Sequence, residues 1–408
     1  MLDVESFWYV GVTFAYLFAR FPSLTQTFCF REVEEMSRQM GAMPIWSLRY
    51  PNDLSEDCPV ELAARTRYLP DRDELKQMFR STRTMIGHFP LSIVWQVKRW
   101  GDKKGKYRLY EAAWLGRELK AQGVTHIHTH FAGIGARTAW WINKLYGISY
   151  SFTGHANDMF CANDDPITLD DLVASAKFVI TVSNFSRDWL CKFLPKYQDK
   201  IFRIYNGIPL SPVRNALEIE RVPLLLSVGR LIEKKGFADL IKACASLRTK
   251  KLKFQCQIIG TGPLEQSLRE QVSLLGLEDF IFFSGALSFE EVRRCLRQAS
   301  VFVLPCITEA NGGMDNLPTV ILEAMEMNLP VVSTALAAIP EMVCDGETGF
   351  LVQERNPDRL AEKLADLLSS SQLRMTMGAA GRSLVEKQFS VQITVQQLCE
   401  RVNNVAEF

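Results

Sequence analysis

The feature that most constrains the fold is a strand, a glycine loop and a helix that follow one another between residues 301 and 330. Residues 301–305 form a short apolar run, which is typical of a buried strand. Gly312 and Gly313 follow in the loop, and an apolar pattern with helical spacing starts after Pro318. Proline suits the first turn of a helix, where its missing N–H costs no hydrogen bond. This order of elements predicts an α/β unit of a parallel sheet.

The start of the predicted helix suits a bound anion. A helix N-terminus presents unpaired N–H groups and a partial positive charge, and the two glycines let a ligand approach the backbone. Asp315 and Glu323 are separated by seven residues. Both carboxylates would repel a phosphate, so we expect them to face hydroxyl groups. A nucleotide sugar offers a diphosphate and hydroxyls together, although a plain strand-to-helix turn with solvated carboxylates explains these residues equally well.

The same order of elements occurs earlier, between residues 223 and 247. An apolar run at 223–228 ends in Gly229 and Arg230, and a charged loop with Lys235 precedes a helical pattern. Arg230 offers a planar fork for phosphate oxygens and Lys235 offers a point charge. An exposed basic turn is the alternative, but it does not explain an arginine directly after a strand-ending glycine. We therefore predict that both residues bind phosphate.

The length and composition predict two globular domains. The chain has 408 residues, which is too long for one hydrophobic core. Its net charge of +1 gives no argument for nucleic-acid binding. Ten cysteines are scattered without a CxxC pair, which predicts reduced thiols in a cytoplasmic protein. The apolar run 7–18 follows two acidic residues and no basic ones, so we expect a strand over 9–18 and no signal peptide.

Three histidines alternate along a predicted strand at residues 124–131. His126, His128 and His130 would lie on one face of this strand. A metal site is one interpretation, but three imidazoles on a single strand fit tetrahedral coordination poorly. His130 ends the strand, and His155 follows the next predicted strand. The carboxyl ends of parallel strands are where α/β proteins bind ligands, so both histidines are candidate site residues.

Together these motifs resemble the retaining glycosyltransferases of carbohydrate-active family four, which have the GT-B fold. The stretch from Asp315 to Thr334 resembles the family's E-x(7)-E region, with aspartate in place of the first glutamate. Residues 229–236 resemble its GR…KG segment and residues 153–158 its T-x-H-x-x-D segment. The histidine strand resembles the family's HIHAHFA signature, where no metal is bound. The similarity is strong over 223–355, and the most similar members are bacterial exopolysaccharide and colanic-acid-type enzymes.

The resemblance implies a role for each matching residue. Arg230 and Lys235 would neutralise the leaving diphosphate, and Glu323 would bind the ribose hydroxyls. His155 and Asp315 would contact the donor sugar, so that His155, Asp315, Arg230 and Lys235 form the expected catalytic set. The other residues expected at the substrates are Thr25, His130, Ala286, Leu287, Asn311, Gly312, Gly313, Met314, Leu317, Pro318 and Thr319.

The expected co-substrate is a UDP-sugar, with UDP-glucose favoured, and the resemblance implies neither a cofactor nor a metal. A GxG at 260–262 lacks the third glycine of a dinucleotide-binding motif and precedes Pro263, which argues against NAD. The expected acceptor is a hydroxyl of a saccharide or lipid-linked saccharide in polysaccharide biosynthesis. Two alternatives stay open: a GT-B nucleotide-sugar epimerase, and a non-catalytic protein that binds sugar nucleotides.

A basic cluster at 98–108 follows an apolar, aromatic run at 89–100. Basic residues beside exposed aromatics can bind an anionic membrane surface, at about 1 kcal/mol for each basic residue. Peripheral membrane contact is therefore one interpretation of this segment. A solvated helix face over a packed core is the interpretation that we favour.

We therefore predict an α/β protein with two Rossmann-like domains facing a cleft, the GT-B fold. The predicted parts are an N-terminal acceptor domain at 1–207, a linker at 208–222, a nucleotide-sugar domain at 223–385, and a final helix at 386–408 that returns to the N-terminal domain. Without a clear protein nucleophile, the predicted chemistry is a displacement on one face of the sugar, with retention of configuration.

Overall fold

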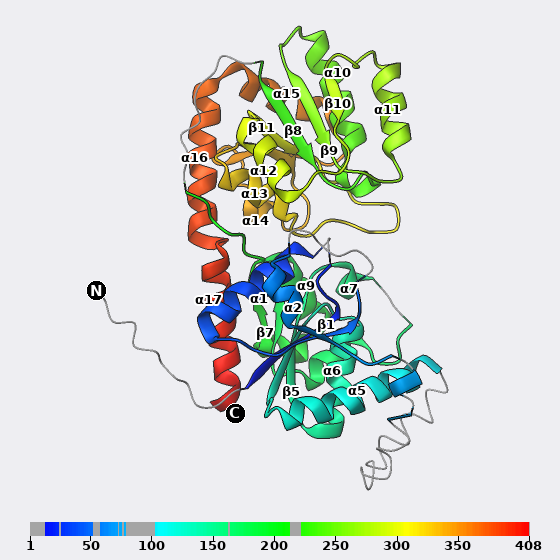
Figure 1. Cartoon of the computed structure of the whole chain (residues 1–408). Helices are drawn as coiled ribbons and strands as arrows, with labels where there is room; N and C mark the ends of the chain where they lie inside the picture. The colour runs from blue at the N-terminus through cyan, green and yellow to red at the C-terminus, as the bar shows by residue number, and fades with distance from the viewer. Residues whose placement is uncertain are drawn as a thin grey trace, which may run out of the picture. The chain divides into compact units, whose positions relative to one another are not determined.

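Two parallel sheets organise the protein. The computed structural model describes residues 13–23, 26–51, 58–71, 73–75, 77–78, 103–161, 164–212 and 222–407. The chain divides into two compact units (Figure 1). The first contains the described residues up to Val182, Arg187–Ile204 and the end of the chain from Val395; the second contains Ser183–Ser186 and Tyr205–Thr394.

The first unit is built on a seven-stranded sheet in the order β3-β2-β1-β4-β5-β6-β7, with every neighbouring pair parallel. Its central strands are buried along nearly their whole length. Continuous burial is typical of parallel sheets that helices cover on both faces. The strands are β1 (Phe14–Arg20), β2 (Ile45–Arg49), β3 (Thr66–Tyr68), β4 (His126–His130), β5 (Ser149–Gly154), β6 (Val179–Thr181) and β7 (Ile201–Arg203).

Helices connect these strands, as parallel pairing requires. Helices α5 and α6 pack side by side (Figure 1). A Cβ atom on Gly135 of α6 would lie 2.4 Å from the Thr129 hydroxyl, so only glycine lets this helix approach β4 so closely. The helices are α1 (Thr27–Met40), α2 (Val60–Arg65), α5 (Lys103–Ala121), α6 (Ile134–Tyr146), α7 (Asn157–Phe160), α8 (Leu169–Ser175), α9 (Asn184–Phe193) and the 3-10 helix η1 (Pro195–Lys200).

The second unit repeats this plan with six parallel strands, in the order β10-β9-β8-β11-β12-β13. Counted from its own first strand, the order is 3-2-1-4-5-6, which is the doubly wound Rossmann order. The strands are β8 (Leu224–Val228), β9 (Gln255–Ile259), β10 (Ile281–Phe283), β11 (Val301–Leu304), β12 (Val331–Thr334) and β13 (Gly349–Val352).

A buried ion pair stabilises the helices of the second unit. The Arg382 guanidinium lies 2.9 Å from the Glu326 carboxylate and donates to the Ser211 carbonyl at 2.7 Å. This pair therefore joins two helices to the start of the connecting segment. The helices are η2 (Glu233–Lys235), α10 (Phe237–Thr249), α11 (Glu265–Leu274), α12 (Phe289–Gln298), α13 (Thr319–Glu326), α14 (Ile339–Met342), α15 (Pro357–Ser369) and α16 (Ser371–Gln388).

The last helices are α17 (Val391–Asn403) and the 3-10 helix η3 (Asn404–Glu407). From Val395 onward α17 belongs to the first unit. There the Cys399 sulfur lies 3.3 Å from the Met36 sulfur, and the Arg401 guanidinium lies 3.8 Å from the centre of the Phe202 ring.

Several boundaries differ from those predicted. The strand expected at 9–18 is observed from Phe14 to Arg20, because its pairing with β2 continues as far as Arg20 and Arg49. Strand β3 is absent from the prediction, since its three residues carry little apolar pattern. Residues 183–186 and 205–207, predicted in the N-terminal domain, group with the second unit.

Hydrogen bonds explain why these residues join the second unit. The Glu341 carboxylate accepts from the backbone N–H groups of Asn184 and Phe185, each at 2.8 Å, and from the Tyr205 hydroxyl at 2.9 Å. A charged acceptor of three donors is a strong anchor. The predicted linker core at 213–221 lies outside the described residues.

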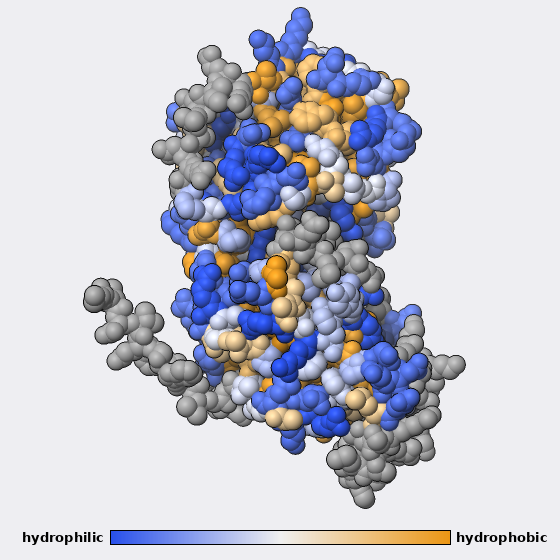
Figure 2. Space-filling view, viewed as in Figure 1, coloured by the Kyte–Doolittle hydropathy of each residue, from blue (hydrophilic) through white to orange (hydrophobic). Residues whose placement is uncertain are grey.

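The surface shows patches of hydrophobic side chains among hydrophilic ones on the face seen in Figure 2. Among the helices that the structure describes, none is both long and apolar enough to cross a membrane. The aromatic run at 89–100, and the basic residues up to 102, fall outside the part of the chain that the structure describes.

Candidate functional site

In the second unit, the predicted phosphate-binding residues gather where the strand order reverses. Strands β8 and β11 are neighbours at the centre of the sheet, and their following connections run in opposite directions. Ligands of doubly wound proteins bind at the carboxyl ends of such strands. Arg230 follows β8, and the loop that leads to α13 follows β11. We call Arg230, Lys234, Lys235 and Asp315 the basic edge.

A close backbone contact brings the basic edge together. Gly236 has a φ of 69°, and a Cβ atom on it would lie 1.8 Å from the Pro305 carbonyl oxygen. Only glycine allows this approach, which sets η2 against the end of β11. As a result, Lys235 forms an ion pair with Asp315, and the Lys234 ammonium lies 2.8 Å from the other carboxylate oxygen.

Burial and charge compete in this ion pair. Burial alone would lower the pKa of Lys235, but the Asp315 carboxylate outweighs burial and raises that pKa. Burial alone would raise the pKa of Asp315, but Lys235 and Lys234 hold it below its usual value. The positive charge of Arg230, an exposed residue directly after β8, acts in the opposite direction and lowers the pKa of Lys235. Lys235 and Asp315 therefore form a charged pair near neutral pH.

The glycine loop is held in shape by its own hydrogen bonds. The Glu309 N–H donates to the Gly313 carbonyl at 2.8 Å, and the Gly313 N–H donates to the Asn311 side chain at 2.7 Å. Gly312, with a φ of 82°, takes the left-handed conformation that this turn requires. Asn316 anchors the far end of the loop, because its amide contacts the hydroxyls of Ser183 and Ser186 at 3.0 and 2.8 Å.

The remaining predicted residues of this unit lie in the glycine loop, in α13 and in the loop after β10, and they differ in exposure. Asn311 and Gly312 are exposed, whereas Leu317 and Pro318 are buried at the start of α13. Gly313 is buried, Met314 and Thr319 are half-buried, and so is Glu323 in the second turn of α13. Ala286 is exposed and Leu287 half-buried in the loop after β10.

In the first unit, the histidine strand forms a ladder with hydroxyl side chains of β5. The His126 ring contacts Ser149 and Ser151, each at 2.8 Å, and the His128 ring contacts Ser151 at 2.8 Å and Thr153 at 3.0 Å. Burial lowers the pKa of His126 and of His128 to about 3. These two histidines are therefore neutral parts of the core.

His130 and His155 belong to a separate chain of hydrogen bonds, which we call the histidine cluster. The Tyr16 hydroxyl donates to Glu32 Oε1 at 2.7 Å, and the same oxygen lies 3.0 Å from His130 Nε2. His130 Nδ1 lies 3.1 Å from His155 Nε2. Both histidines were predicted as site residues from the sequence, whereas Tyr16 and Glu32 were not. Lys234 of the other unit was not predicted either, although it stands beside Lys235.

Asp158 joins the loop that follows β4 to the loop that follows β5. Its carboxylate accepts from the backbone N–H groups of Ala132, His155 and Ala156, at 2.9, 3.1 and 2.7 Å. Burial raises the pKa of Asp158, although these hydrogen bonds oppose the shift. Asp158 thereby fixes the backbone that carries His155. Thr25, the other predicted residue of this unit, lies outside the described residues.

One group of side chains in the described part of the chain has the spacing of a metal site. Ligand atoms of Glu32, His128 and His130 lie within 4.8 Å of one another. However, both nitrogens of His128 already contact hydroxyls, and Glu32 and His130 contact each other. A cation would have to replace these hydrogen bonds, so the donor set fits a hydrogen-bonded cluster better than a metal.

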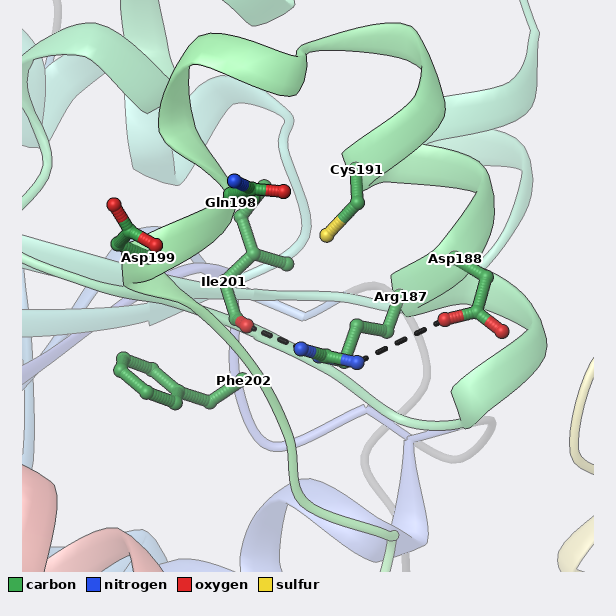
Figure 3. A pocket seen from close by; sticks show the side chains of 7 residues that line it. All are labelled: Arg187, Asp188, Cys191, Gln198, Asp199, Ile201 and Phe202. Atoms are coloured by element: carbon green, nitrogen blue, oxygen red, sulfur yellow. Dashed lines mark hydrogen bonds and ion pairs between the residues drawn. The ribbon is translucent and has the colours of Figure 1, made fainter.

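A surface pocket of about 330 Å³ lies elsewhere on the first unit, between α9, η1 and β7 (Figure 3). The Arg187 guanidinium crosses it, with contacts to the Ile201 carbonyl at 3.3 Å and to Asp188 at 3.8 Å. None of the predicted site residues lines this pocket. The other lining residues are Cys191, Gln198, Asp199 and Phe202.

Comparison with known proteins agrees with the division of the chain into two units. Residues 213–384 match the family model of glycosyl transferases group 1, and residues 58–212 match that of glycosyltransferase family 4. A putative colanic acid biosynthesis glycosyltransferase, WcaL of Escherichia coli K12, is 28% identical over 93% of this chain and 96% of its own length.

Two further proteins extend this comparison. A GDP-mannose-dependent phosphatidylinositol monomannoside mannosyltransferase of Mycobacterium tuberculosis is 32% identical over 44% of this chain and 47% of its own length. The crystal structure of Anabaena Alr3699/HepE with UDP superposes with a TM-score of 0.70 at 16% identity, over 96% of this chain and all (100%) of that one.

The two family models cover consecutive stretches that together run from residue 58 to residue 384. Each of the two doubly wound sheets falls largely within one of these stretches. The chain therefore belongs to the family 4, group 1 glycosyltransferases, enzymes with the two Rossmann-like domains of the GT-B fold.

Proposed function

We propose that this glycosyltransferase moves a sugar from a nucleotide diphosphate sugar to a hydroxyl of a saccharide or lipid-linked saccharide, with retention of configuration and without a metal ion. The observation that supports the proposal is the basic edge. Three cations and the start of α13 lie at the reversal point of the second sheet, where doubly wound proteins bind nucleotides. The similarity to the colanic acid enzyme supports a role in exopolysaccharide biosynthesis.

In this proposal the basic edge stabilises the leaving diphosphate. Negative charge grows on the diphosphate as the bond to the sugar breaks, and fixed positive groups aimed at that charge lower the barrier. Arg230 and Lys235 supply such groups, together with the N–H groups that begin α13. The ion pair with Asp315 holds Lys235 in place before the donor arrives. Glu323 binds the ribose hydroxyls, and His155 contacts the donor sugar.

UDP-glucose is the proposed donor, and GDP-mannose is the second candidate. The relative from Mycobacterium tuberculosis is GDP-mannose-dependent, whereas the Anabaena structure contains UDP. The loop after β10, with Ala286 and Leu287, is where the proposal places the base. Backbone groups there would distinguish uracil from guanine by their hydrogen-bonding patterns.

Calorimetric titration in the presence of EDTA tests the donor. UDP-glucose should bind to the unaltered protein, and binding should be lost in Arg230→Ala. Arg359→Ala is the matched control, because Arg359 is an exposed residue of α15 paired only with Glu362 among the ion pairs observed. If GDP-mannose binds instead, the base assignment is wrong. If neither binds, or if Arg230→Ala binds normally, the donor site is wrong.

The anomeric configuration of the product tests the stereochemistry. The proton NMR spectrum of freshly formed product should show the configuration of the donor sugar. An inverted product would overturn the same-face displacement.

A further inference from the structure

We propose that Asp315 determines the preference of this enzyme for a nucleotide sugar over the nucleoside diphosphate that is left after transfer. Its carboxylate competes with a bound diphosphate for Lys234 and Lys235. Asp315 acts in this way only if the basic edge is the diphosphate site, and to that extent the inference rests on the proposed function. It goes further by giving Asp315 a part in the release of product. All the groups involved belong to the second unit.

The Asp315 carboxylate uses both of its oxygens on lysines. Oδ1 lies 2.8 Å from the Lys234 ammonium, and Oδ2 forms the ion pair with Lys235. The Cys306 sulfur is a further neighbour, 3.9 Å from Oδ2. An ionised carboxylate only accepts hydrogen bonds, and an ammonium group only donates them. Each oxygen of Asp315 therefore already has a charged donor.

These ion pairs are shielded from water. The side chains of Lys234, Lys235 and Asp315 are only 13–15% exposed. Opposite charges attract more strongly where water is excluded, because the effective dielectric constant is lower there. Exposed ion pairs contribute little, whereas the loss of one partner from a buried pair leaves the other charge uncompensated. Asp315 is therefore a strong competitor for any other anion at the two lysines.

Packing holds the two lysines beside the carboxylate. A Cβ atom on Gly229 would lie 3.3 Å from two carbons of the Lys235 side chain, so the stem of this lysine lies along the backbone that follows β8. The Ile307 N–H donates to the Lys234 carbonyl at 3.0 Å, which joins η2 to the segment that follows β11. Both lysines are thus fixed at the edge of the sheet where a diphosphate is proposed to bind.

A diphosphate at the basic edge needs the same hydrogen-bond donors. Its oxygens are negatively charged acceptors, as are those of Asp315. A carboxylate and a diphosphate that share the same ammonium groups repel each other. The carboxylate therefore has to turn away from at least one lysine when a diphosphate binds. This rearrangement lowers the affinity for every ligand that carries a diphosphate.

The sugar of the donor changes this balance. Sugar hydroxyls can donate hydrogen bonds to the displaced carboxylate, whereas a nucleoside diphosphate has no group in their place. A desolvated carboxylate without donors is unfavourable. The donor thus replaces the lysine contacts of Asp315, and the product does not. After transfer the carboxylate returns to the lysines, and the diphosphate loses two of the three cations of the basic edge.

Calorimetric titration with inorganic pyrophosphate, UDP and UDP-glucose in the presence of EDTA tests this competition. Asp315→Asn keeps the shape of the side chain and removes its charge. Pyrophosphate and UDP should bind to this variant about tenfold to hundredfold more tightly than to the unaltered protein, which is the range for hydrogen bonds to a charged group. UDP-glucose should gain less, because it also loses its contacts with the carboxylate. The preference for UDP-glucose over UDP should therefore decrease.

Two further variants are controls. Glu309→Gln removes a carboxylate that lies beside Gly313 in the same loop and forms no ion pair within the described part of the chain, so all three affinities should be unchanged. Asp315→Glu keeps the charge and should keep the weak binding of pyrophosphate. Weaker or unchanged pyrophosphate binding in Asp315→Asn would overturn the competition, because the carboxylate would then only hold the lysines in place. An equal gain in Glu309→Gln would overturn it as well.

Crystal structures of the unaltered protein test the same competition without relying on a variant that folds. With UDP bound, the distance from the Asp315 carboxylate to at least one of the two lysines should exceed about 4 Å, the usual limit for an ion pair. With UDP-glucose bound, the carboxylate should contact a sugar hydroxyl. Asp315 still paired with both lysines in the UDP complex would disprove its competition with the diphosphate.

Failure of this inference is distinguishable from failure of the proposed function. If UDP-glucose binds to the unaltered protein, but Asp315→Asn leaves the preference for UDP-glucose over UDP unchanged, Asp315 does not set that preference and the donor site stands. If no nucleotide sugar binds to the unaltered protein, the donor site is wrong, and the role of Asp315 in product release is wrong with it.

Discussion

The two sheets share the strand order 3-2-1-4-5-6, to which the first adds a seventh strand, but they place different chemistry at the point where the order reverses. In the first unit this point holds the histidine cluster, where hydrogen bonds link two buried imidazole rings and a half-buried carboxylate. In the second unit it holds the basic edge, where one carboxylate pairs with two of three cations, so that net positive charge remains. One scaffold can thus present either a fixed hydrogen-bonding group or net positive charge, depending on the few residues that follow its central strands.

The largest expected contrast is in acid stability. His126 and His128 have pKa values of about 3 when folded, below the value of about 6.5 for an unfolded chain. As the pH falls from about 6.5 toward 3, the unfolded state binds protons that the folded state excludes. Each histidine therefore lowers the stability by about 1.4 kcal/mol per pH unit, or roughly 4 kcal/mol for both between pH 6.5 and 5.

The second unit should not share this loss, because no histidine follows position 155 in the sequence. The pKa of Asp315 is lowered, so its contribution is present above about pH 4 and is lost only as the pH falls further. All eight tryptophans lie at or before position 189, so their fluorescence in urea reports on the first unit. Replacing His126 with Gln should reduce the pH slope by about half; an unchanged slope would contradict the prediction.

The second contrast concerns catalysis. Lys235→Ala should lower kcat about a hundredfold to a thousandfold, because it removes one preorganised cation from the leaving group. Lys234→Ala should have a smaller effect, since Lys235 still pairs with Asp315. Lys242→Ala is the control, because Lys242 is exposed on α10 and pairs with Asp239 at 3.3 Å. Equal activity of Lys235→Ala and the control would show that the basic edge does not act in transfer.

A third experiment weakens the first unit without touching the second. Asp158→Asn replaces a charged acceptor of three backbone N–H groups by a neutral amide. Hydrogen bonds to a charged group are each worth about 1.5–3 kcal/mol, and we expect a loss of about 2–3 kcal/mol in the tryptophan-reported transition. Asp164→Asn is the control, because Asp164 is exposed. A shift of the same size in both variants would mean that the loop anchor is unimportant.

The smallest expected effect is a gain of stability in the second unit. Ala337 has a φ of 47°, a conformation that costs an L-residue about 1–2 kcal/mol. Ala337→Gly removes this backbone strain and should stabilise the protein by about 0.5–1 kcal/mol. The gain is smaller than the strain, because glycine has more conformational freedom than alanine in the unfolded chain and so loses more on folding. Its neighbour Ala338 is buried with a φ of −92°, so Ala338→Gly should destabilise. Thermal unfolding followed by circular dichroism distinguishes these opposite signs.

The sequence allowed the architecture to be predicted because the signals were local. Apolar runs ended in glycine or in a charged loop, and helical patterns followed them, so the elements from Leu224 to Thr249 were expected within a residue or two. The doubly wound fold and its family followed from these units. Strand β3 was missed, because three residues with one buried side chain carry no usable pattern.

The partners of the site residues could not be predicted from local signals. Glu32 and His130 are separated by 98 positions, and their contact depends on the register of β4 and the rotation of α1. The ion pair of Lys235 with Asp315 likewise requires the approach of Gly236 to Pro305. In the free protein Asp315 contacts lysines, whereas the sequence suggested only a sugar hydroxyl.

The path of the chain limits how this enzyme can be recombined with its relatives. The chain passes between the units four times, once on each side of Ser183–Ser186, once after Ile204 and once within α17. A chimera joined only at the sequence midpoint would leave Asn316 without the serines that hold it, and Glu341 without the backbone of Asn184 and Phe185. The second unit therefore has to be exchanged together with Ser183–Ser186, and the last turns of α17 have to stay with the first unit.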